Sequence, residues 1–302
     1  MSDSAKGVAA ILLACTIWGF ATLYYKALSH VPPMEVLAHR TLWTLVFFGA
    51  LLAAQRRLSA VPALLIGPLR ARIIGAAAIV SVNWGLFIWA IQSGHAVQAS
   101  LGYYILPLVS VLLGVALLGE RLSRLQGAAV GLAALAVAVL TLGQGVPPFI
   151  ALALALSFAP YLVIKKKLNA PAVVSVTAEV LVLAPLALAY LIWQGGGVAA
   201  QDLNTALMLP ISGIITGGPL ILFSWGAQRV RLSTLGIVGY LNPTIQMYSA
   251  VMIFGEPFTP WHGAAFGLIW AGLALYSAES WRQDRVARRL ASSVDTSATV
   301  MK

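Results

Sequence analysis

Residues 81–136 read SVNWGLFIWAIQSGHAVQASLGYYILPLVSVLLGVALLGERLSRLQGAAVGLAALA, and most landmarks of this stretch return 136 positions later. The landmarks keep their residue type and their spacing without a gap, which chance does not supply at one constant offset. We therefore interpret the stretch and its second copy as an internal repeat. The matched landmarks are Trp89 and Trp225, Gln92 and Gln228, Tyr104 and Tyr240, Pro107 and Pro243, and Gly119-Glu120 and Gly255-Glu256.

The composition of the 302-residue chain indicates a membrane protein. Hydrophobic residues make up 60% and charged residues only 9%, whereas soluble domains carry about 25% charged residues. The mean hydropathy of +0.89 agrees. Because helices satisfy their own backbone hydrogen bonds in lipid, we expect an all-α integral membrane protein. Each span needs enough apolar residues to cross about 30 Å of hydrocarbon.

Ten apolar segments are long enough to span a bilayer, and Pro, Gly and polar residues separate them. Most connections are short, so neighbouring helices are expected to be antiparallel. The predicted spans are 7–29, 34–54, 72–92, 97–118, 124–142, 147–165, 172–193, 208–228, 233–254 and 259–279.

The positions of the basic residues predict the orientation. Of the 19 Lys and Arg residues, all but Lys26 and Arg40 lie at the termini or in alternate connections. The positive-inside rule then places both termini in the cytoplasm. We expect a multi-pass protein of the inner (plasma) membrane. We interpret the net charge of +10 as this topogenic signal, with contact to anionic membrane lipid as a consequence, and we expect no nucleic-acid partner.

The repeat and the topology together predict the architecture. Each copy holds five spans, an odd number, so the second copy is expected to be inverted relative to the first. We expect a first five-helix repeat at residues 1–143, a second at 144–281 and a basic cytoplasmic tail at 282–302. Inverted repeats are typical of transporters that alternate between inward-open and outward-open shapes. A non-transporting membrane scaffold is the alternative from another class.

Several motifs carry a resemblance to a known family, and they run from the first predicted span to the tenth. The motifs are Ile17-Trp18-Gly19, residues 33–43 (PMEVLAHRTLW), Asn83-Trp84, residues 86–90 (LFIWA), residues 99–103 (ASLGY), Pro107-Leu108, Leu118-Gly119-Glu120, Ser157-Phe158, Lys165-Lys166-Lys167 and residues 231–236 (RLSTLG). With these motifs the sequence resembles the RarD branch of the drug/metabolite transporter superfamily, which also includes the YddG-type amino-acid exporters. The resemblance implies two inverted five-helix EamA-like units around a central cavity.

Ionisable residues inside spans are rare, and they usually face a protein interior or a wet cavity. Arg40 and Glu179 occupy near-equivalent positions in the second helix of each repeat, in opposite leaflets. Our hypothesis is that they line one cavity, with Arg40 binding a carboxylate and Glu179 an ammonium or a transported proton. The alternative is that both are structural tethers. His39 is a further candidate, with hydrogen-bonded packing as its alternative.

Polar and aromatic residues at mid-membrane depth complete the candidate substrate site. Asn83 and Trp84 lie at the middle of the third span, the depth at which transporters bind substrate. Pro219, their repeat equivalent, follows Gly217-Gly218 and is predicted to act as a hinge. Ordinary packing or interface anchoring is the alternative for aromatic residues. The remaining candidates are Trp18, Tyr103, Tyr240 and Asn242.

Other motifs predict packing or exclude chemistry. Small-residue faces at Gly127 and Gly131, and at Gly263 and Gly267, are expected to pack the fifth and tenth helices within each repeat, with a homodimer contact as the alternative. Glu120 and Glu256 are interpreted as tethers of the hairpins that follow the fourth and ninth helices. The single cysteine forms no disulfide within the chain.

The sequence shows no metal-ligand spacing of His, Cys or Asp, no Walker-type loop and no nucleophile with a partner base. We therefore expect no enzyme, no metal and no cofactor. We expect a secondary transporter or facilitator that exports small amphipathic metabolites, in the first place amino acids with broad specificity, by alternating access. Amphenicol-type drugs and nucleobase-like metabolites are the alternatives. Proton coupling and facilitated diffusion both stay open.

Overall fold

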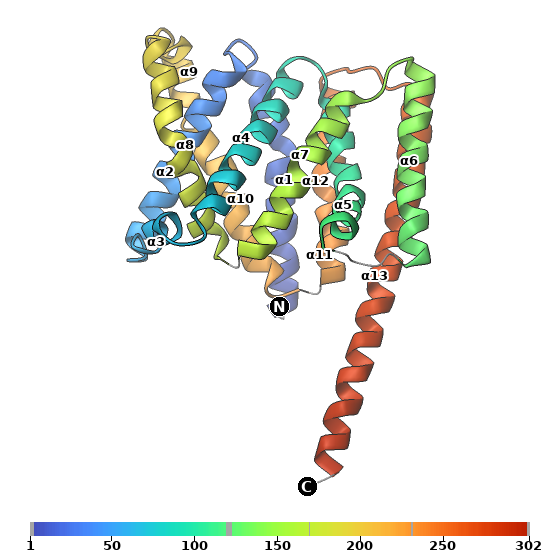
Figure 1. Ribbon diagram of the computed structural model, residues 1–302. Helices are drawn as coiled ribbons and strands as arrows, with labels where there is room; N and C mark the ends of the chain where they lie inside the picture. Colours follow the sequence, from blue (N-terminus) through green and yellow to red (C-terminus); the bar gives the residue numbers. More distant parts are fainter. Residues whose placement is uncertain (1–2, 119–122, 169, 231, 301–302) are drawn as a thin grey trace.

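The computed structural model describes residues 3–118, 123–168, 170–230 and 232–300, and every regular element in those ranges is a helix. The long helices stand side by side as a bundle, and both chain ends lie at one end of it (Figure 1). In chain order the elements are α1 (Asp3–Ala27), α2 (Pro33–Ala54), α3 (Ala60–Ile66), α4 (Arg70–Gln92), α5 (Ala96–Leu118), α6 (Arg124–Gln144), α7 (Phe149–Leu168), α8 (Ala172–Trp193), η1 (Val198–Ala200), α9 (Leu203–Met208), α10 (Ile211–Ala227), α11 (Leu232–Gly239), α12 (Leu241–Tyr248), η2 (Ser249–Ile253) and α13 (Pro260–Val300).

Eight helices of the described chain are long and apolar enough to cross a membrane. They coincide with the first eight predicted spans, with ends that differ by a few residues. The eighth candidate, Leu203–Ala227, takes in the short α9 as well as α10. The expected class, an all-helical integral membrane protein, is therefore confirmed.

The predicted ninth span, 233–254, is divided into α11, α12 and the π-helical turn η2. The division falls at Tyr240, the residue before α12. Pro243 favours a break here, because proline has no N–H for the carbonyl of Gly239 and its ring crowds that carbonyl. Its repeat counterpart Pro107 lies inside the continuous helix α5. The two copies therefore differ in backbone at this point.

The connections and the C-terminal end also depart from the prediction. The short helices α3 and α9 occupy regions expected to be loops. The last helix begins close to its predicted start but continues through Val300, over most of the expected tail. Figure 1 shows this end of α13 projecting well beyond the bundle.

Helices at equivalent places in the two copies of the repeat pack against each other: α2 against α8, α5 against α12, and α6 against α13. The remaining large contacts also occur in matched pairs. Helix α1 packs on α10 and α12, and its counterpart α7 packs on α4 and α5. The chain therefore interleaves its two halves instead of forming two separate bundles.

Close approach of α10 to α2 depends on a small residue. A Cβ built on Gly213 would lie 2.4 Å from the carbonyl oxygen of Trp43. Backbone at that distance cannot move away as a side chain could. Glycine at this position therefore permits the α2–α10 contact that brings Thr216 toward Arg40.

The small-residue faces of the fifth and tenth helices do not pack as expected. A Cβ on Gly127, Gly131 or Gly267 would meet nothing within 4 Å, and the contact between α6 and α13 runs instead through Gly272, beside the carbonyl of Ala129. The prediction that these three glycines form the packing faces of the fifth and tenth helices within the chain is therefore wrong. A side chain at each of these positions would point away from the partner helix. A homodimer contact stays a prediction.

Two buried or partly buried carboxylates bind backbone N–H groups of distant segments. Glu35 accepts from Val198 and Ala199, both at 3.1 Å. Glu256 accepts from Ala96 at 2.7 Å and Val97 at 2.8 Å, the first residues of α5. Helix N-termini leave such N–H groups unsatisfied and favour negative charge.

Glu256 therefore joins the turn before α13 to the start of α5, so the hairpin that it is predicted to tether is held to a helix of the first half of the chain. Its repeat counterpart Glu120 lies outside the described residues.

Candidate functional site

The centre of the candidate site is Arg40 of α2, whose side chain is 8% exposed. Its Nε donates a hydrogen bond of 3.0 Å to Thr216 Oγ1 on α10. Its guanidinium carbon lies 3.9 Å from the ring centroid of Trp84 on α4 and 5.7 Å from that of Tyr25 on α1. Four helices thus meet at one cation, and aromatic faces stabilise it by cation–π attraction.

The local sequence of α10 explains why Thr216 reaches Arg40. A Cβ on the next residue, Gly217, would lie 2.5 Å from the ring of Phe47 on α2, so any larger residue would displace that ring. Threonine has a short side chain, and at this close helix approach its hydroxyl can accept from the guanidinium. The pair Thr216-Gly217 thus fixes one edge of Arg40.

The other edge of Arg40 has no partner within the described chain. The only acceptor bonded to the guanidinium is Thr216, and the described ion pairs do not include Arg40. The two terminal nitrogens of Arg40 are not fully enclosed by protein atoms, so a ligand can reach them. A buried charge without a counter-ion is strongly unfavourable. Arg40 therefore presents an unpaired, reachable pair of N–H donors that suits a carboxylate.

A chain of aromatic rings begins beside Arg40 and ends beside Glu179. Consecutive centroids are 5.2 to 6.3 Å apart, and the first three contacts are edge-to-face, the geometry that aromatic pairs prefer. The rings, in order, belong to Tyr25, Phe87, Tyr103, Phe158 and Tyr161.

Glu179 has a full set of partners of its own. Lys165 Nζ lies 2.6 Å from Glu179 Oε1, and the Tyr161 hydroxyl donates to Oε2 at 3.0 Å. Lys165 also donates to Ser175. Glu179 is fully buried and the Lys165 side chain is 19% exposed. The carboxylate is thus neutralised within the chain, whereas Arg40 is not.

Asn83, the neighbour of Trp84, connects α4 to α7. Its Nδ2 donates to the carbonyl of Leu154 at 3.1 Å and to Ser157 Oγ at 3.0 Å. Its Oδ1 is buried and has no partner among the described residues. Asn83 therefore acts as a brace between two helices, directly next to the residue that contacts Arg40.

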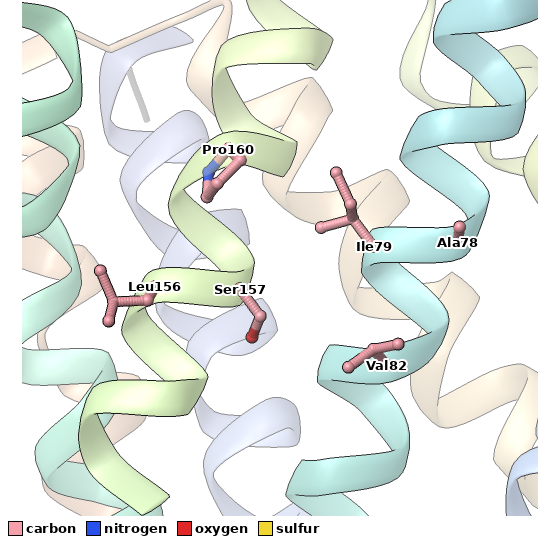
Figure 2. A pocket seen from close by; sticks show the side chains of 6 residues that line it. All are labelled: Ala78, Ile79, Val82, Leu156, Ser157 and Pro160. Carbon is pink, nitrogen blue, oxygen red and sulfur yellow. The ribbon is translucent and has the colours of Figure 1, made fainter. Parts of the chain in front are cut away.

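A groove of about 330 Å³ lies between α4 and α7, beside Ser157, the hydrogen-bond partner of Asn83. Figure 2 shows the hydroxyl of Ser157 directed into the space between the two helices. Two wall residues, Val82 and Leu156, are well exposed on the outside of the bundle. The groove carries no charged side chain and is separate from the Arg40 cluster. Its lining is Ala78, Ile79, Val82, Leu156, Ser157 and Pro160.

The other predicted site residues have different neighbours, and their roles stay predictions. His39 Nε2 is buried and has no partner among the described residues, and Pro219 is buried within α10. The remaining three are paired: Trp18 with Phe223 (centroids 5.7 Å apart), Tyr240 with Tyr104 (6.2 Å), and Asn242 Oδ1 with Gln246 Nε2 (3.0 Å).

Sequence reasoning selected Arg40, Trp84 and Tyr103, which the structure brings together, but it missed Tyr25 and Thr216. A signal for Tyr25 was available, because Tyr161 stands 136 positions later, at the offset of the repeat. These two tyrosines contact Arg40 and Glu179 respectively. No comparable signal points to Thr216, whose role depends on packing between distant helices.

A protein-family comparison and a comparison with individual proteins both find matches over nearly the whole chain. The EamA-like transporter family matches residues 5–142 and again residues 147–278. Protein RarD of Streptomyces exfoliatus is 43% identical over 287 residues, covering 93% of this chain and 90% of that protein. The chloramphenicol-sensitive protein RarD of Pseudomonas aeruginosa is 31% identical over 303 residues, covering 96% and 99%.

A solved crystal structure shares the fold, with a TM-score of 0.61 at 20% identity over 92% of this chain and 99% of that one. The family match over both halves and the full-length similarity to RarD proteins agree with the motifs of the sequence. The chain therefore belongs to the EamA-like transporter family, in the RarD branch of the drug/metabolite transporter superfamily.

Proposed function

We propose that this protein is a secondary transporter that exports small amphipathic metabolites, with amino acids as the first substrate class, by alternating access. The observation that carries the proposal is Arg40: a buried cation without an acidic partner in the described chain, beside a row of aromatic rings. A carboxylate with an apolar body complements both features. Membership of a transporter family supports transport of such a ligand. Among the described residues of the site, none is arranged for catalysis.

We extend the architecture to ten spans in two inverted repeats. Supporting it are the two family matches, the constant sequence offset and the packing of equivalent helices against each other. The ninth span is then the composite of α11, α12 and η2, and the tenth is the first part of α13. In such a protein the substrate site lies between the repeats, near the bilayer midplane. Arg40, Trp84 and Thr216 come from both repeats, as this arrangement requires.

The same proposal places both termini in the cytoplasm and the protein in the inner membrane. The supporting observations are the basic residues of alternate connections and the position of both chain ends at one end of the bundle (Figure 1). Reporter fusions at residue 302 and in the connection at residues 195–201 should report opposite sides. Reporters on the same side would contradict the topology.

A second candidate substrate class is the amphenicols. The support is the name of one relative, the chloramphenicol-sensitive protein RarD of Pseudomonas aeruginosa. Chloramphenicol is neutral and has an aromatic body, so it would use the aromatic rings without needing Arg40. Transport that survives loss of the Arg40 charge would favour this class over amino acids.

The test is counterflow of a mixed panel of labelled amino acids in proteoliposomes, with and without a pH gradient. Arg40→Gln should abolish counterflow. The matched control is Arg229→Gln, because Arg229 also stacks on a tryptophan, Trp225, at 3.8 Å, but at the protein surface. Equal activity of the Arg40→Gln and Arg229→Gln variants would refute the assigned site.

The pH gradient distinguishes the two driving mechanisms. Flux without a gradient supports facilitated diffusion and leaves Glu179 with a structural role. Flux that requires the gradient supports proton coupling, with Glu179 as the first residue to substitute. Absence of amino-acid flux in both conditions would contradict the first substrate class and direct the assay to amphenicols and nucleobases.

A further inference from the structure

We infer that the Arg40 site recognises its substrate as an organic monoanion, a carboxylate on an aromatic body, and does not bind the ammonium group of an amino acid. This inference rests on the proposed function and narrows its substrate class, because it favours aromatic carboxylates without an amino group over the amino acids that come first in that proposal. It follows from the partners of every acidic side chain that the structure describes.

A free carboxylate would be the strongest partner for an ammonium group inside the bundle, and none is available among the described side chains. Each acidic side chain has a partner within the chain. The pairs are Asp3 with Lys6, Glu35 with the N–H groups of Val198 and Ala199, Glu179 with Lys165 and Tyr161, Asp202 with Asn204 and Thr205, Glu256 with the N–H groups of Ala96 and Val97, and Glu279 with Arg282.

The remaining acidic residues, Glu120, Asp284 and Asp295, lie outside the described side chains. In the sequence they fall in a predicted cytoplasmic connection and in the predicted cytoplasmic tail, away from the middle of any predicted span. They therefore do not provide a mid-membrane partner for an ammonium in the predicted topology.

The positive side of the site is, in contrast, incomplete without a ligand. The guanidinium of Arg40 uses one edge for Thr216 and one face for Trp84, at 3.0 and 3.9 Å. The outer edge retains the parallel N–H donors that bind a carboxylate bidentately. Binding there would neutralise the buried charge.

The apolar part of the ligand has a defined environment. Tyr25, Phe87 and Tyr103 form consecutive edge-to-face contacts of 5.9 and 5.6 Å that begin at Arg40. Tyr25 and Phe87 are only 2% and 6% exposed, so a flat aromatic body would contact the partly buried rings of Trp84 and Tyr103. In an α-amino acid the ammonium is attached next to the carboxylate, so it would be held close to the Arg40 cation with no counter-charge. The amino group should therefore weaken binding.

The experiment compares ligands that differ only in their charged groups. Binding of 3-phenylpropanoate, phenylalanine, phenethylamine and neutral 3-phenylpropanamide is measured by isothermal titration calorimetry on the full-length protein in nanodiscs. We expect 3-phenylpropanoate to bind at least about tenfold more tightly than phenylalanine and the amide, since a charge-assisted bidentate contact is gained. Phenethylamine should bind no more tightly than the amide.

Substitutions then test the contact itself. Arg40→Gln should remove the preference for 3-phenylpropanoate over the amide, whereas Arg229→Gln should retain it. Arg40→Lys keeps the charge but loses the planar fork, and it should reduce the preference at least about threefold. It also gives a result if the glutamine variant does not fold.

Phenylalanine binding as tightly as 3-phenylpropanoate, competition by phenethylamine, or no binding in the whole series would each overturn the inference. The proposed function fails differently. Selective binding of 3-phenylpropanoate without any counterflow would keep the carboxylate site and reject transport. Amino-acid counterflow without a preference for the compound lacking the amino group would keep transport and reject this specificity.

Discussion

Tyr104 and Tyr240, which occupy equivalent positions in the two copies of the repeat, stack on each other with centroids 6.2 Å apart and planes 14° apart. Equivalent residues of the two copies can touch only where the copies pack against each other. The stacked pair therefore marks where the two halves of the chain meet. Their surroundings are nevertheless unequal, because Tyr104 is 1% exposed and its hydroxyl lies 2.6 Å from Thr244 Oγ1.

This inequality gives a matched pair of substitutions. Thr244 donates to the carbonyl of Tyr240 at 2.7 Å, so its hydroxyl accepts from Tyr104. Tyr104→Phe should lower the free energy of unfolding by about 1 kcal/mol through the lost hydrogen bond. Tyr240→Phe should change it by less than about 0.5 kcal/mol, since its hydroxyl has no hydrogen bond among the described residues. Unfolding in detergent, followed by tryptophan fluorescence, measures both. Equal losses would contradict this assignment.

The ion pair between Lys165 and Glu179 should contribute mainly to stability. Lys165→Met leaves a buried carboxylate without its cation and should destabilise the protein by about 3 kcal/mol. Lys167→Met, at an exposed position of the same helix, is the control and should have little effect. The double variant Lys165→Met/Glu179→Gln should lose less stability than the sum of the single losses. Additive losses in a double-mutant cycle would show that the two side chains do not interact.

Helix α10 provides a test of close packing. Gly213→Ala places a Cβ 2.4 Å from the carbonyl oxygen of Trp43 and should destabilise the protein by about 1–3 kcal/mol. Gly49→Ala, inside α2, meets nothing within 4 Å and should be neutral or stabilise the helix by about 0.5–1 kcal/mol. Thermal unfolding of the two variants side by side is the measurement. A stable Gly213→Ala variant would mean that α2 and α10 lie farther apart than the structure shows.

The hydrogen bond between Arg40 and Thr216 should orient the guanidinium for its ligand. Thr216→Val removes the acceptor at constant shape and should weaken binding of 3-phenylpropanoate about threefold to tenfold, while Thr216→Ser should restore it. Stability should change less than binding, because the hydroxyl mainly selects one orientation of Arg40. An unchanged dissociation constant for the valine variant would exclude this positioning role.

The sequence alone determined the membrane class, most of the helical segments, the internal repeat and the family. These features depend on local properties: a helix in lipid must satisfy its own backbone groups, so segment length and hydropathy suffice to locate it. Proline gave a partial signal. Pro107 and Pro243 match in sequence, but only the region before Pro243 is divided into two helices.

Tertiary structure decided which of the buried charges is free. Arg40 and Glu179 are near-equivalent in the sequence, yet Glu179 is paired with Lys165. Among the described residues Arg40 meets only Thr216, 176 positions away, and aromatic faces. The sequence could not distinguish them, because the lipid-facing surface of a membrane helix is as apolar as its packed surface. Hydropathy therefore does not reveal which face of a helix turns inward, and only the packing of distant helices assigns each charge its partner.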